Sequence, residues 1–509
     1  MEIFIKCLYN QTEEMEMNTE TMRTRFAPSP TGMLHLGNAN TALFNYLLSR
    51  HNNGTVVLRI EDTDVERSEE NYEKQMIDDL RWLGLDWDEG PDVGGPYAPY
   101  RQSERLDIYN EHIQRLLDSG HLYRCFCTKE QVQADRDEAA RKKRPPRYSG
   151  RCRSLPPEQT EKLLAENLPY TLRFRVPQRE KVIVKDLIRG DIIFNAAELD
   201  DFILVRSNGI PIFLLTNLVD DVLMHITHVV RGEDHISNTP KQILIARALG
   251  YDTPIFLHTA IILGADRSKL SKRHGAVSVS QFRDEGFLPE TMLNYLAFLG
   301  WNPKDEREIF SLPQLIAEFS IESMSKNPSI FDHQRLRFLN GQWLQKIEPT
   351  RVADLCRQYL ITHGYLTPER AEADKDRIAK IVAAIGTRLK TISDVVTYGD
   401  FFFTNDFPYQ EEGVKKHFHG AETAHILEGI KEIISGAADE RPEALEALLR
   451  KFTEEKGIDT RKVIHPLRLA LTGKTVGPGV FEIMTILEKE EVARRITRTV
   501  NFISEKQTP

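Results

Sequence analysis

The sequence predicts an α/β fold in which helices cover a parallel sheet, with an inserted α+β module and an all-helical C-terminal region. Three observations lead to this prediction. Strand-like and helical patterns alternate between residues 23 and 83, residues 101–200 mix short alternating segments with turns, and from about residue 346 apolar residues recur with helical spacing. A chain of 509 residues is long enough for about three domains.

The first segment reads as a βαβ unit. A short strand from Arg23 ends at the loop 28–32, where two prolines and a glycine break it. A helix with one apolar face follows, and the face comprises Leu36, Leu43, Phe44, Leu47 and Leu48. The strand 55–60 then runs into Glu61, and a second helix follows over 76–83. Because ligands bind beyond the carboxyl ends of parallel strands, the 28–32 loop and the Glu61 turn should face one crevice.

Residues 101–200 are predicted to form the inserted module. They hold a cluster of cysteines, a basic run at 141–147 and an alternating segment at 170–176. Strand-like patterning returns at 202–205, 211–215 and 225–230, where we expect the sheet to be completed.

The C-terminal region, residues 346–509, is predicted to be helical. Apolar residues share one helix face over 352–360, and similar sets occur at 378–385 and 445–452. Glycines between 473 and 479 should separate the last helices. Residues 1–22 are expected to be a dispensable tail, because they carry five acids against one lysine and contain the alternative start residues Met15, Met17 and Met22.

The composition excludes several classes of protein. A hydrophobic content of 40% with 28% charged residues is typical of a globular chain. The formal net charge of −9 argues against a uniformly basic coat for non-specific nucleic-acid binding, so basic contacts should gather on one face. Five cysteines in so long a chain do not make a disulfide scaffold, and no apolar run reaches the ~20 residues of a membrane helix. We therefore expect a cytoplasmic protein that is not held in a membrane.

Two loops carry residues suited to phosphate chemistry. The loop 28–38 follows a strand and opens a helix, so its backbone N–H groups can face an anion, with His35 as an additional donor. The loop 265–275 holds five Lys, Arg or His residues among small ones, and such cations can stabilise a transferring nucleotidyl group. Each loop alone also has a plainer interpretation, as a capped helix start and as a solvated basic loop.

Together the two loops resemble the paired signatures of class I aminoacyl-tRNA synthetases. His35-Leu36-Gly37-Asn38 stands at the His-Ile-Gly-His signature, and Lys269-Leu270-Ser271-Lys272-Arg273 stands at the Lys-Met-Ser-Lys-Ser signature. From residue 23 to about 503 the chain is similar to the bacterial glutamyl-tRNA synthetases. The further motifs that carry this resemblance are residues 25–32, 58–64, 89–91, 100–105, 219–221 and 231–235.

The resemblance implies an enzyme that joins L-glutamate to ATP and passes the glutamyl group to tRNA(Glu). It implies a Rossmann-type catalytic domain at 23–100 and 201–250, an inserted acceptor-stem-binding module at 101–200, a stem-contact region at 251–345 and a helical anticodon-binding region at 346–509. Mg²⁺ should arrive with ATP. Charging of tRNA(Gln) stays open, and a monomer is expected.

The resemblance also implies site residues for catalysis and nucleotide binding. Transition-state stabilisation is expected from His35 and Lys272, with support from Lys269. The residues expected to bind ATP are Pro28, Ser29, Thr31, Gly32, His35, Gly37, Asn38, Leu270, Ser271, Lys272 and Arg273.

A glutamate pocket needs cations for two carboxylates and an anion for the amine. Arg25 and Arg231 match the arginines that bind glutamate in the family, and Glu61 matches the acid that faces the amine. The other matching positions are Ala27, Ser29, Phe213 and Asn217. The family usually has Tyr where this chain has Phe213, so one hydroxyl is missing.

The cysteines at 125, 127 and 152 raise the question of a metal. Three thiolates suit tetrahedral zinc, which needs a fourth ligand. Zinc-bearing family members have His where this chain has Ser154, and Tyr148 could serve instead as it looks to do in a shortened relative. The ligand set would be Cys125, Cys127, Tyr148 and Cys152, and the zinc would be structural. The alternative is a vestigial site of three reduced thiols.

Arg388 matches a position where the family reads the anticodon, although a surface ion pair is an alternative. The closest competing enzyme is glutaminyl-tRNA synthetase, whose C-terminal part is a β-barrel, and a tRNA-modifying relative would lack the C-terminal helices. A catalytically inactive tRNA-binding paralogue is the alternative from another class of protein.

Overall fold

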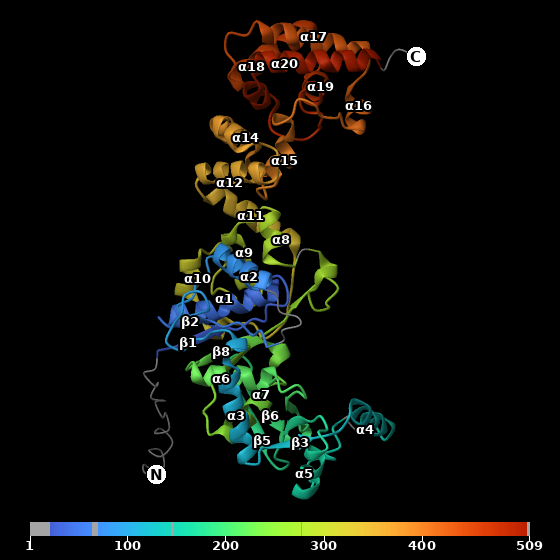
Figure 1. Ribbon diagram of the computed structural model, residues 1–509. Coiled ribbons are helices and arrows are strands. Elements are labelled where there is room, and N and C mark those ends of the chain that lie inside the picture. The colour runs from blue at the N-terminus through green and yellow to red at the C-terminus, as the bar shows by residue number, and fades with distance from the viewer. Residues whose placement is uncertain (1–20, 64–69, 144–146, 276, 506–509) are drawn as a thin grey trace, which may run out of the picture. The chain divides into compact units, whose positions relative to one another are not determined.

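The fold is seen in a computed structural model that describes residues 21–63, 70–143, 147–275 and 277–505 (Figure 1). The expected tail therefore lies almost entirely outside the described residues. The chain forms two compact units. The first extends to Gln281 and includes Met292–Asp332, and the second comprises Phe282–Thr291 and the chain from His333 onward. Among the described residues, no helix is both long and apolar enough to cross a membrane.

The strands of the first unit are β1 (Arg23–Phe26), β2 (Thr55–Leu58), β3 (Leu122–Cys125), β4 (Thr171–Phe174), β5 (Lys181–Asp186), β6 (Gly190–Asn195), β7 (Ile203–Val205), β8 (His228–Gly232), β9 (Ile255–Thr259), β10 (Ile262–Leu263) and β11 (Ser329–Ile330). Its helices are α1 (Leu36–His51), α2 (Glu70–Leu83), α3 (Leu106–Asp118), α4 (Lys129–Arg141), α5 (Pro157–Ala165), α6 (Phe213–Leu223), α7 (Thr239–Leu249) and α10 (Leu312–Glu318). Helices α8 (Val279–Asp284) and α9 (Pro289–Phe298) each span a junction between the two units in the sequence.

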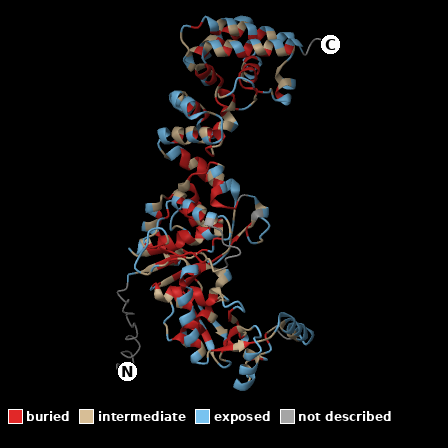
Figure 2. Cartoon of the chain, viewed as in Figure 1, coloured by how far each residue is buried: buried red, intermediate tan, exposed pale blue. Residues whose placement is uncertain are grey.

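The predicted βαβ unit is confirmed. Strands β1 and β2 are parallel, with Arg23 opposite Thr55, and α1 connects them. The five residues predicted for the apolar face of α1 are all buried, at no more than 1% exposure. Each buried leucine contributes about 1.5–3 kcal/mol relative to exposure. Figure 2 shows buried residues along these strands and α1, whereas α4 has no buried residue.

Strand β8 lies beside β1, because Thr227 N–H donates to the Arg23 carbonyl just before β8 begins. A mixed sheet continues from β8 in the order β8-β9-β5-β6, in which β9 is parallel to both β8 and β5. Strands β5 and β6 thus bring part of the segment 101–200 into the same sheet as β8. The rest of that segment contributes β3 and β4 to an antiparallel sheet with β7.

The sequence prediction of a strand at 211–215 is wrong. Ile212 is extended, but Phe213 begins α6, and all its residues from Leu214 to Asp221 are buried. A short apolar run does not distinguish a buried strand from a buried helix, which explains the error. The strand predicted at 225–230 begins later, at His228, because His225 adopts a left-handed turn with φ of 53°.

The second unit confirms the predicted helical region. Its further helices are α11 (His333–Lys346), α12 (Pro349–Thr362), α13 (Pro368–Ala373), α14 (Lys375–Ile385), α15 (Asp394–Gly399), α16 (Glu411–His417), α17 (Ala421–Ser435), α18 (Pro442–Lys456), α19 (Arg461–Thr472) and α20 (Val480–Glu505). The residues between Thr472 and Val480 separate the last two helices, as the glycines there predict. Helix α20 is interrupted at Glu488, where φ is 65°.

Candidate active site

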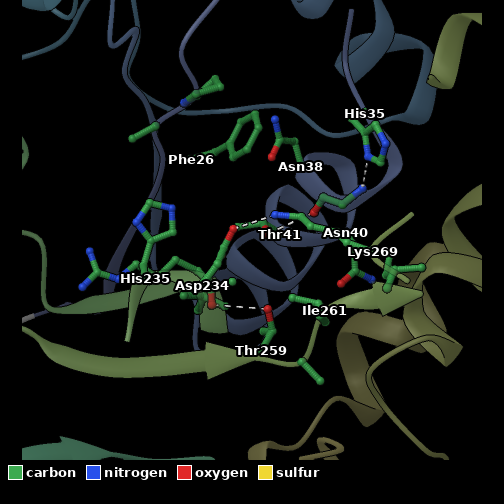
Figure 3. A pocket seen from close by; sticks show the side chains of 18 of the residues that line it. Phe26, His35, Asn38, Asn40, Thr41, Asp234, His235, Thr259, Ile261 and Lys269 are labelled. Atoms are coloured by element: carbon green, nitrogen blue, oxygen red, sulfur yellow. Dashed lines mark hydrogen bonds and ion pairs between the residues drawn. The ribbon is translucent and has the colours of Figure 1, made fainter. Parts of the chain in front are cut away.

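A cavity of about 530 Å³ opens at the carboxyl ends of β1, β8 and β9 in the first unit. Its walls come from the loop after β1, the first turn of α1, α6 and the turn after β8. The residues after β9 and those at 269–271 close it (Figure 3). This is the crevice that the βαβ pattern predicts, because loops at the ends of neighbouring parallel strands meet at one edge of a sheet.

Backbone pairing brings the two signature loops together. Leu36 N–H donates to the Val277 carbonyl and Val279 N–H donates to the Leu34 carbonyl, both at 2.9 Å. These bonds attach the start of α1 to the chain just after the basic loop. As a result His35 and Lys269 line the same cavity, although 234 residues separate them in the sequence (Figure 3).

His35 caps the amino end of α1. Its Nδ1 accepts a hydrogen bond from Gly37 N–H at 3.2 Å. In the neutral ring the proton therefore sits on Nε2. A Cβ at Gly37 would stand in ordinary van der Waals contact with His35 Nδ1, at 3.6 Å. The helix N-terminus is suited to phosphate oxygens.

The basic loop folds onto nearby acids. Lys269 Nζ lies 2.9 Å from Asp234 Oδ2 at the rim of the cavity, and Arg273 pairs with Asp266. Burial alone would raise the pKa of Asp234, but Lys269, His235 and a backbone hydrogen bond together outweigh burial and lower it. Ser271 N–H donates to His274 Nδ1 at 3.0 Å and closes the turn. The backbone of Lys272 begins the 3₁₀ turn η4 (Lys272–His274), and its side chain lies outside the described residues.

Two buried arginines lie on the floor of the cavity with different partners. Arg25 Nε pairs with Asp221 Oδ1 at 3.0 Å. Arg231 contacts only neutral side chains among the described residues, and its buried Nη1 has no hydrogen-bond partner. Burial and the nearby charge of Arg25 lower the pKa of Arg231 to about 9. A buried guanidinium without an acidic partner is suited to bind an anion.

Glu61 stands behind Asn217 rather than on the cavity wall. Asn217 Nδ2 donates to Glu61 Oε1 at 2.7 Å, and Asn217 itself lines the cavity. Burial raises the pKa of Glu61, although Arg59 acts in the opposite direction. Phe213 also lines the cavity, and its ring centre lies 5.3 Å from that of His235.

The cavity brings together most of the predicted site residues. Those on its wall are Arg25, Ala27, Pro28, His35, Gly37, Asn38, Phe213, Asn217, Arg231, Lys269, Leu270 and Ser271. Those described but not on its wall are Ser29, Thr31, Gly32, Glu61 and Arg273. Wall residues that the sequence analysis did not single out include Phe26, Asn40, Thr41, Asp234, His235 and Thr259. The motif 231–235 contains Asp234 and His235 and was the available signal for them.

Comparisons with known proteins show the family to which the chain belongs. A family model described as tRNA synthetases class I (E and Q), catalytic domain, matches residues 21–338, and an anticodon binding domain model matches 351–500. A glutamate–tRNA ligase of Moorella thermoacetica is 46% identical over 484 residues, which cover 95% of this chain and 99% of that protein. The corresponding protein of Desulforudis audaxviator is 45% identical over 486 residues, covering 95% of this chain and 97% of that protein. The chain belongs to the glutamate–tRNA ligase family.

A solved structure of a glutamate–tRNA ligase matches the fold over nearly the whole chain. The ligase from Elizabethkingia meningosepticum, crystallised in complex with its amino acid, is 35% identical and gives a TM-score of 0.84. The match covers 95% of this chain and 100% of that one. The predicted resemblance and the predicted fold class, an α/β catalytic domain followed by a helical anticodon-binding domain, are confirmed for this member of the glutamate–tRNA ligase family.

The predicted zinc ligands of this glutamate–tRNA ligase family member form one cluster at the end of β3. The sulfur atoms of Cys125, Cys127 and Cys152 lie within 4.8 Å of one another. Tyr148 Oη lies 3.2 Å from Cys125 Sγ and 3.7 Å from Cys127 Sγ. Hydrogen bonding by Cys152 lowers the pKa of Cys125, which favours its thiolate.

Arg388, the predicted anticodon residue, is exposed in the 3₁₀ turn η6 (Gly386–Arg388) of the second unit. It lies close enough to Arg468 to act on it electrostatically. Burial lowers the pKa of Arg468, and the charge of Arg388 lowers it further. Arg388 is thus an exposed cation near the half-buried Arg468, in the domain matched to anticodon binding.

Proposed function

We propose that this chain attaches L-glutamate to tRNA(Glu) at the expense of ATP. A glutamate carboxylate oxygen attacks the α-phosphorus of ATP, and diphosphate leaves to give glutamyl adenylate. A hydroxyl of the terminal ribose of tRNA(Glu) then attacks the glutamyl carbonyl carbon, and AMP leaves. The observation that carries the proposal is the unpaired, buried Nη1 of Arg231 beside a cavity that also contains a helix N-terminus and a lysine loop.

The roles proposed for the side chains follow from this chemistry. No enzyme nucleophile is needed, so the chain positions the reactants and stabilises charge. We assign this task to His35, Lys269 and Lys272. The amides at the start of α1 and the 270–273 segment are proposed to bind ATP, and Mg²⁺ arriving with ATP would offset the negative charge of its phosphates.

The proposed glutamate pocket uses Arg25 and Arg231 for carboxylates and Glu61 with Asn217 for the ammonium group. Ala27 and Phe213 line it, and Ser29 stands in the adjacent loop. Because Asp221 already pairs directly with Arg25, whereas Nη1 of Arg231 has no partner among the described residues, Arg231 is proposed to supply the stronger attraction for an anion.

The RNA contacts are proposed to follow the domain order of the sequence analysis. Residues 101–200 would bind the acceptor stem, 251–345 would contact a tRNA stem, and 346–509 would bind the anticodon with Arg388. The proposed enzyme is a monomer. It acts in the cytoplasm, where tRNA is charged for translation.

We also propose a structural zinc held by Cys125, Cys127, Cys152 and Tyr148. Support comes from the donor set itself, because three close sulfur atoms and a phenol oxygen can supply four ligands. The zinc would fix the end of β3 and would take no part in the reaction.

An exchange assay between ATP and radiolabelled diphosphate tests the proposed function. It is run with glutamate or glutamine, each with and without tRNA(Glu). We expect exchange with glutamate when tRNA is present, and little with glutamine. No exchange with glutamate in the presence of tRNA would refute the proposal. Aminoacylation of separately purified tRNA(Glu) and tRNA(Gln) then decides whether the second tRNA is also a substrate.

A further inference from the structure

Neutral groups alone hold the guanidinium of Arg231 among the described residues. Its Nε donates to His258 Nε2 at 3.2 Å. Its Nη2 donates to Thr239 Oγ1 at 2.7 Å and to Gln242 Oε1 at 2.8 Å. Nη1 is left without a partner. Three of its five N–H bonds thus fix the group in place while none of its contacts neutralises its charge.

The tautomer of His258 is determined by its two neighbours. The ring is fully buried, and Nδ1 lies 2.6 Å from Asp186 Oδ2. An ionised carboxylate can only accept, so Nδ1 must carry the proton. Arg231 Nε–H can only donate, so Nε2 must be unprotonated. Burial, together with the charge of Arg231, lowers the pKa of His258 and keeps the ring neutral.

Asp186 is kept ionised by donors on every side. Its Oδ1 accepts hydrogen bonds from the backbone N–H groups of Ile188 and Arg189, at 2.9 and 2.7 Å. Its Oδ2 accepts from His258 N–H at 2.9 Å as well as from the ring. Burial alone would raise the pKa of Asp186, but these donors outweigh burial and lower it.

Three adjacent strands supply the three residues. Asp186 ends β5, His258 lies in β9 and Arg231 lies in β8, and the parallel register places Arg231 directly opposite His258. Because the strands lie in the order β5-β9-β8, the carboxylate of Asp186, the imidazole of His258 and the guanidinium of Arg231 follow one another across the sheet.

We propose that Asp186 and His258 are positioning residues for the glutamate pocket, which hold Arg231 through a neutral imidazole so that its charge stays available for a substrate carboxylate. The inference rests on the proposed function and deepens it. A carboxylate bound directly to Arg231 would satisfy the guanidinium within the protein, and a substrate carboxylate would then compete with it. With the acid one residue away, the arginine is held in place but makes no direct ion pair with a carboxylate of the described residues.

The first test uses exchange kinetics with tRNA(Glu) present, because the Michaelis constants for glutamate and ATP can be measured separately. His258→Phe removes the acceptor, and Asp186→Asn removes the group that fixes the tautomer. Each is expected to raise the KM for glutamate about tenfold or more, with the KM for ATP changed less than about twofold. His258→Gln keeps a neutral acceptor and is expected to recover most of the loss. Thermal melting and tRNA binding show whether each variant is folded.

The second test places a negative charge directly beside Arg231 and stays informative if the His258 and Asp186 variants do not fold. Gln242→Glu keeps an oxygen acceptor for Arg231 and adds a negative charge beside the guanidinium, and it also removes the donor that Gln242 Nε2 provides to Asn217 Oδ1 at 2.9 Å. We expect the KM for glutamate to rise about tenfold or more. Gln314→Glu, the same change in the capping box of α10, is the matched control and should leave both constants unchanged.

The outcomes distinguish this inference from the proposed function. If the wild-type chain exchanges with glutamate but Gln242→Glu leaves its KM for glutamate unchanged, the positioning role is refuted while the proposed function stands. The same holds if the KM values for ATP and glutamate rise together in folded variants. If the wild-type chain shows no exchange with glutamate, the proposed function itself fails.

Discussion

Asp221 joins two buried arginines, since its Oδ1 lies 3.0 Å from Arg25 Nε and 2.8 Å from Arg59 Nη2. All three side chains are almost completely buried. The carboxylate thus compensates one arginine of the proposed substrate pocket and one that lies behind it. Removing a buried partner leaves charge that solvent cannot screen.

Asp221→Asn is therefore expected to destabilise the first unit by about 3–5 kcal/mol, seen in calorimetry as a lower thermal midpoint. Asp86→Asn is the control, because Asp86 is 74% exposed in its pair with Arg50 and should contribute less than about 1 kcal/mol. Equal midpoints for the two variants would contradict the role of Asp221.

The pH dependence of stability follows from the same carboxylate. Burial would raise the pKa of Asp221, but Arg25 and Arg59 outweigh it and hold the pKa below its usual range. The stabilisation is therefore complete above the unfolded pKa of about 4 and is lost as the pH falls through the lower folded value. Between pH 5 and pH 8 the difference between wild type and Asp221→Asn should stay constant, and it should shrink below about pH 4.

Lys269→Ala is expected to slow glutamate-dependent exchange by about tenfold or more while leaving the thermal midpoint unchanged. The pair with Asp234 is exposed at both ends, so its loss costs less than about 1 kcal/mol of folding free energy. Lys462→Ala, which breaks an equally exposed pair with Glu422, should change neither quantity. A normal exchange rate in Lys269→Ala would show that Lys269 has no part in catalysis.

Phe213→Tyr restores the hydroxyl that the family usually carries at this position. If the hydroxyl reaches the substrate, one hydrogen bond adds about 0.5–1.5 kcal/mol, which lowers the KM for glutamate about two- to tenfold. The KM for ATP should not change. An unchanged KM for glutamate would mean that the hydroxyl makes no contact with the substrate.

The zinc proposal predicts one equivalent of zinc per purified chain, measured by mass spectrometry of the metal. Cys125→Ser should lower this content strongly, because serine is a poor zinc ligand. Cys356→Ser changes a buried cysteine of the other unit and should retain the metal. A wild-type chain without zinc would favour the alternative of three reduced thiols.

Local patterns predict the elements of this protein better than the contacts between them. The spacing of Leu36, Leu43 and Leu47 is enough to predict α1, because helix periodicity is a local property. That His35 and Lys269 line the same cavity was predictable only from the family resemblance, because no periodicity relates residues so far apart in the sequence.

The contact of Asp186 with His258 had no signal in the sequence. It depends on the register of β5 against β9, across 72 residues, and a single residue of slippage would turn either side chain to the opposite face. The cavity wall likewise omits Ser29, Thr31 and Gly32, although they share a loop with Pro28. A shared motif predicts that residues lie near the cavity, whereas the path of the backbone decides which of their side chains reach it.

Backbone hydrogen bonds tether the basic loop in its middle and just beyond its end. Leu270 N–H donates to the Ile262 carbonyl on one side, and the pairing of Val277 and Val279 with residues 34–36 fixes the other. The span between these tethers is only a few residues long. A rearrangement confined to that span leaves the flanking backbone bonds intact. A movement within that span, which contains Lys272, would have to change local contacts such as the one between Ser271 N–H and His274 Nδ1, while the backbone bonds at Leu270, Val277 and Val279 stay in place.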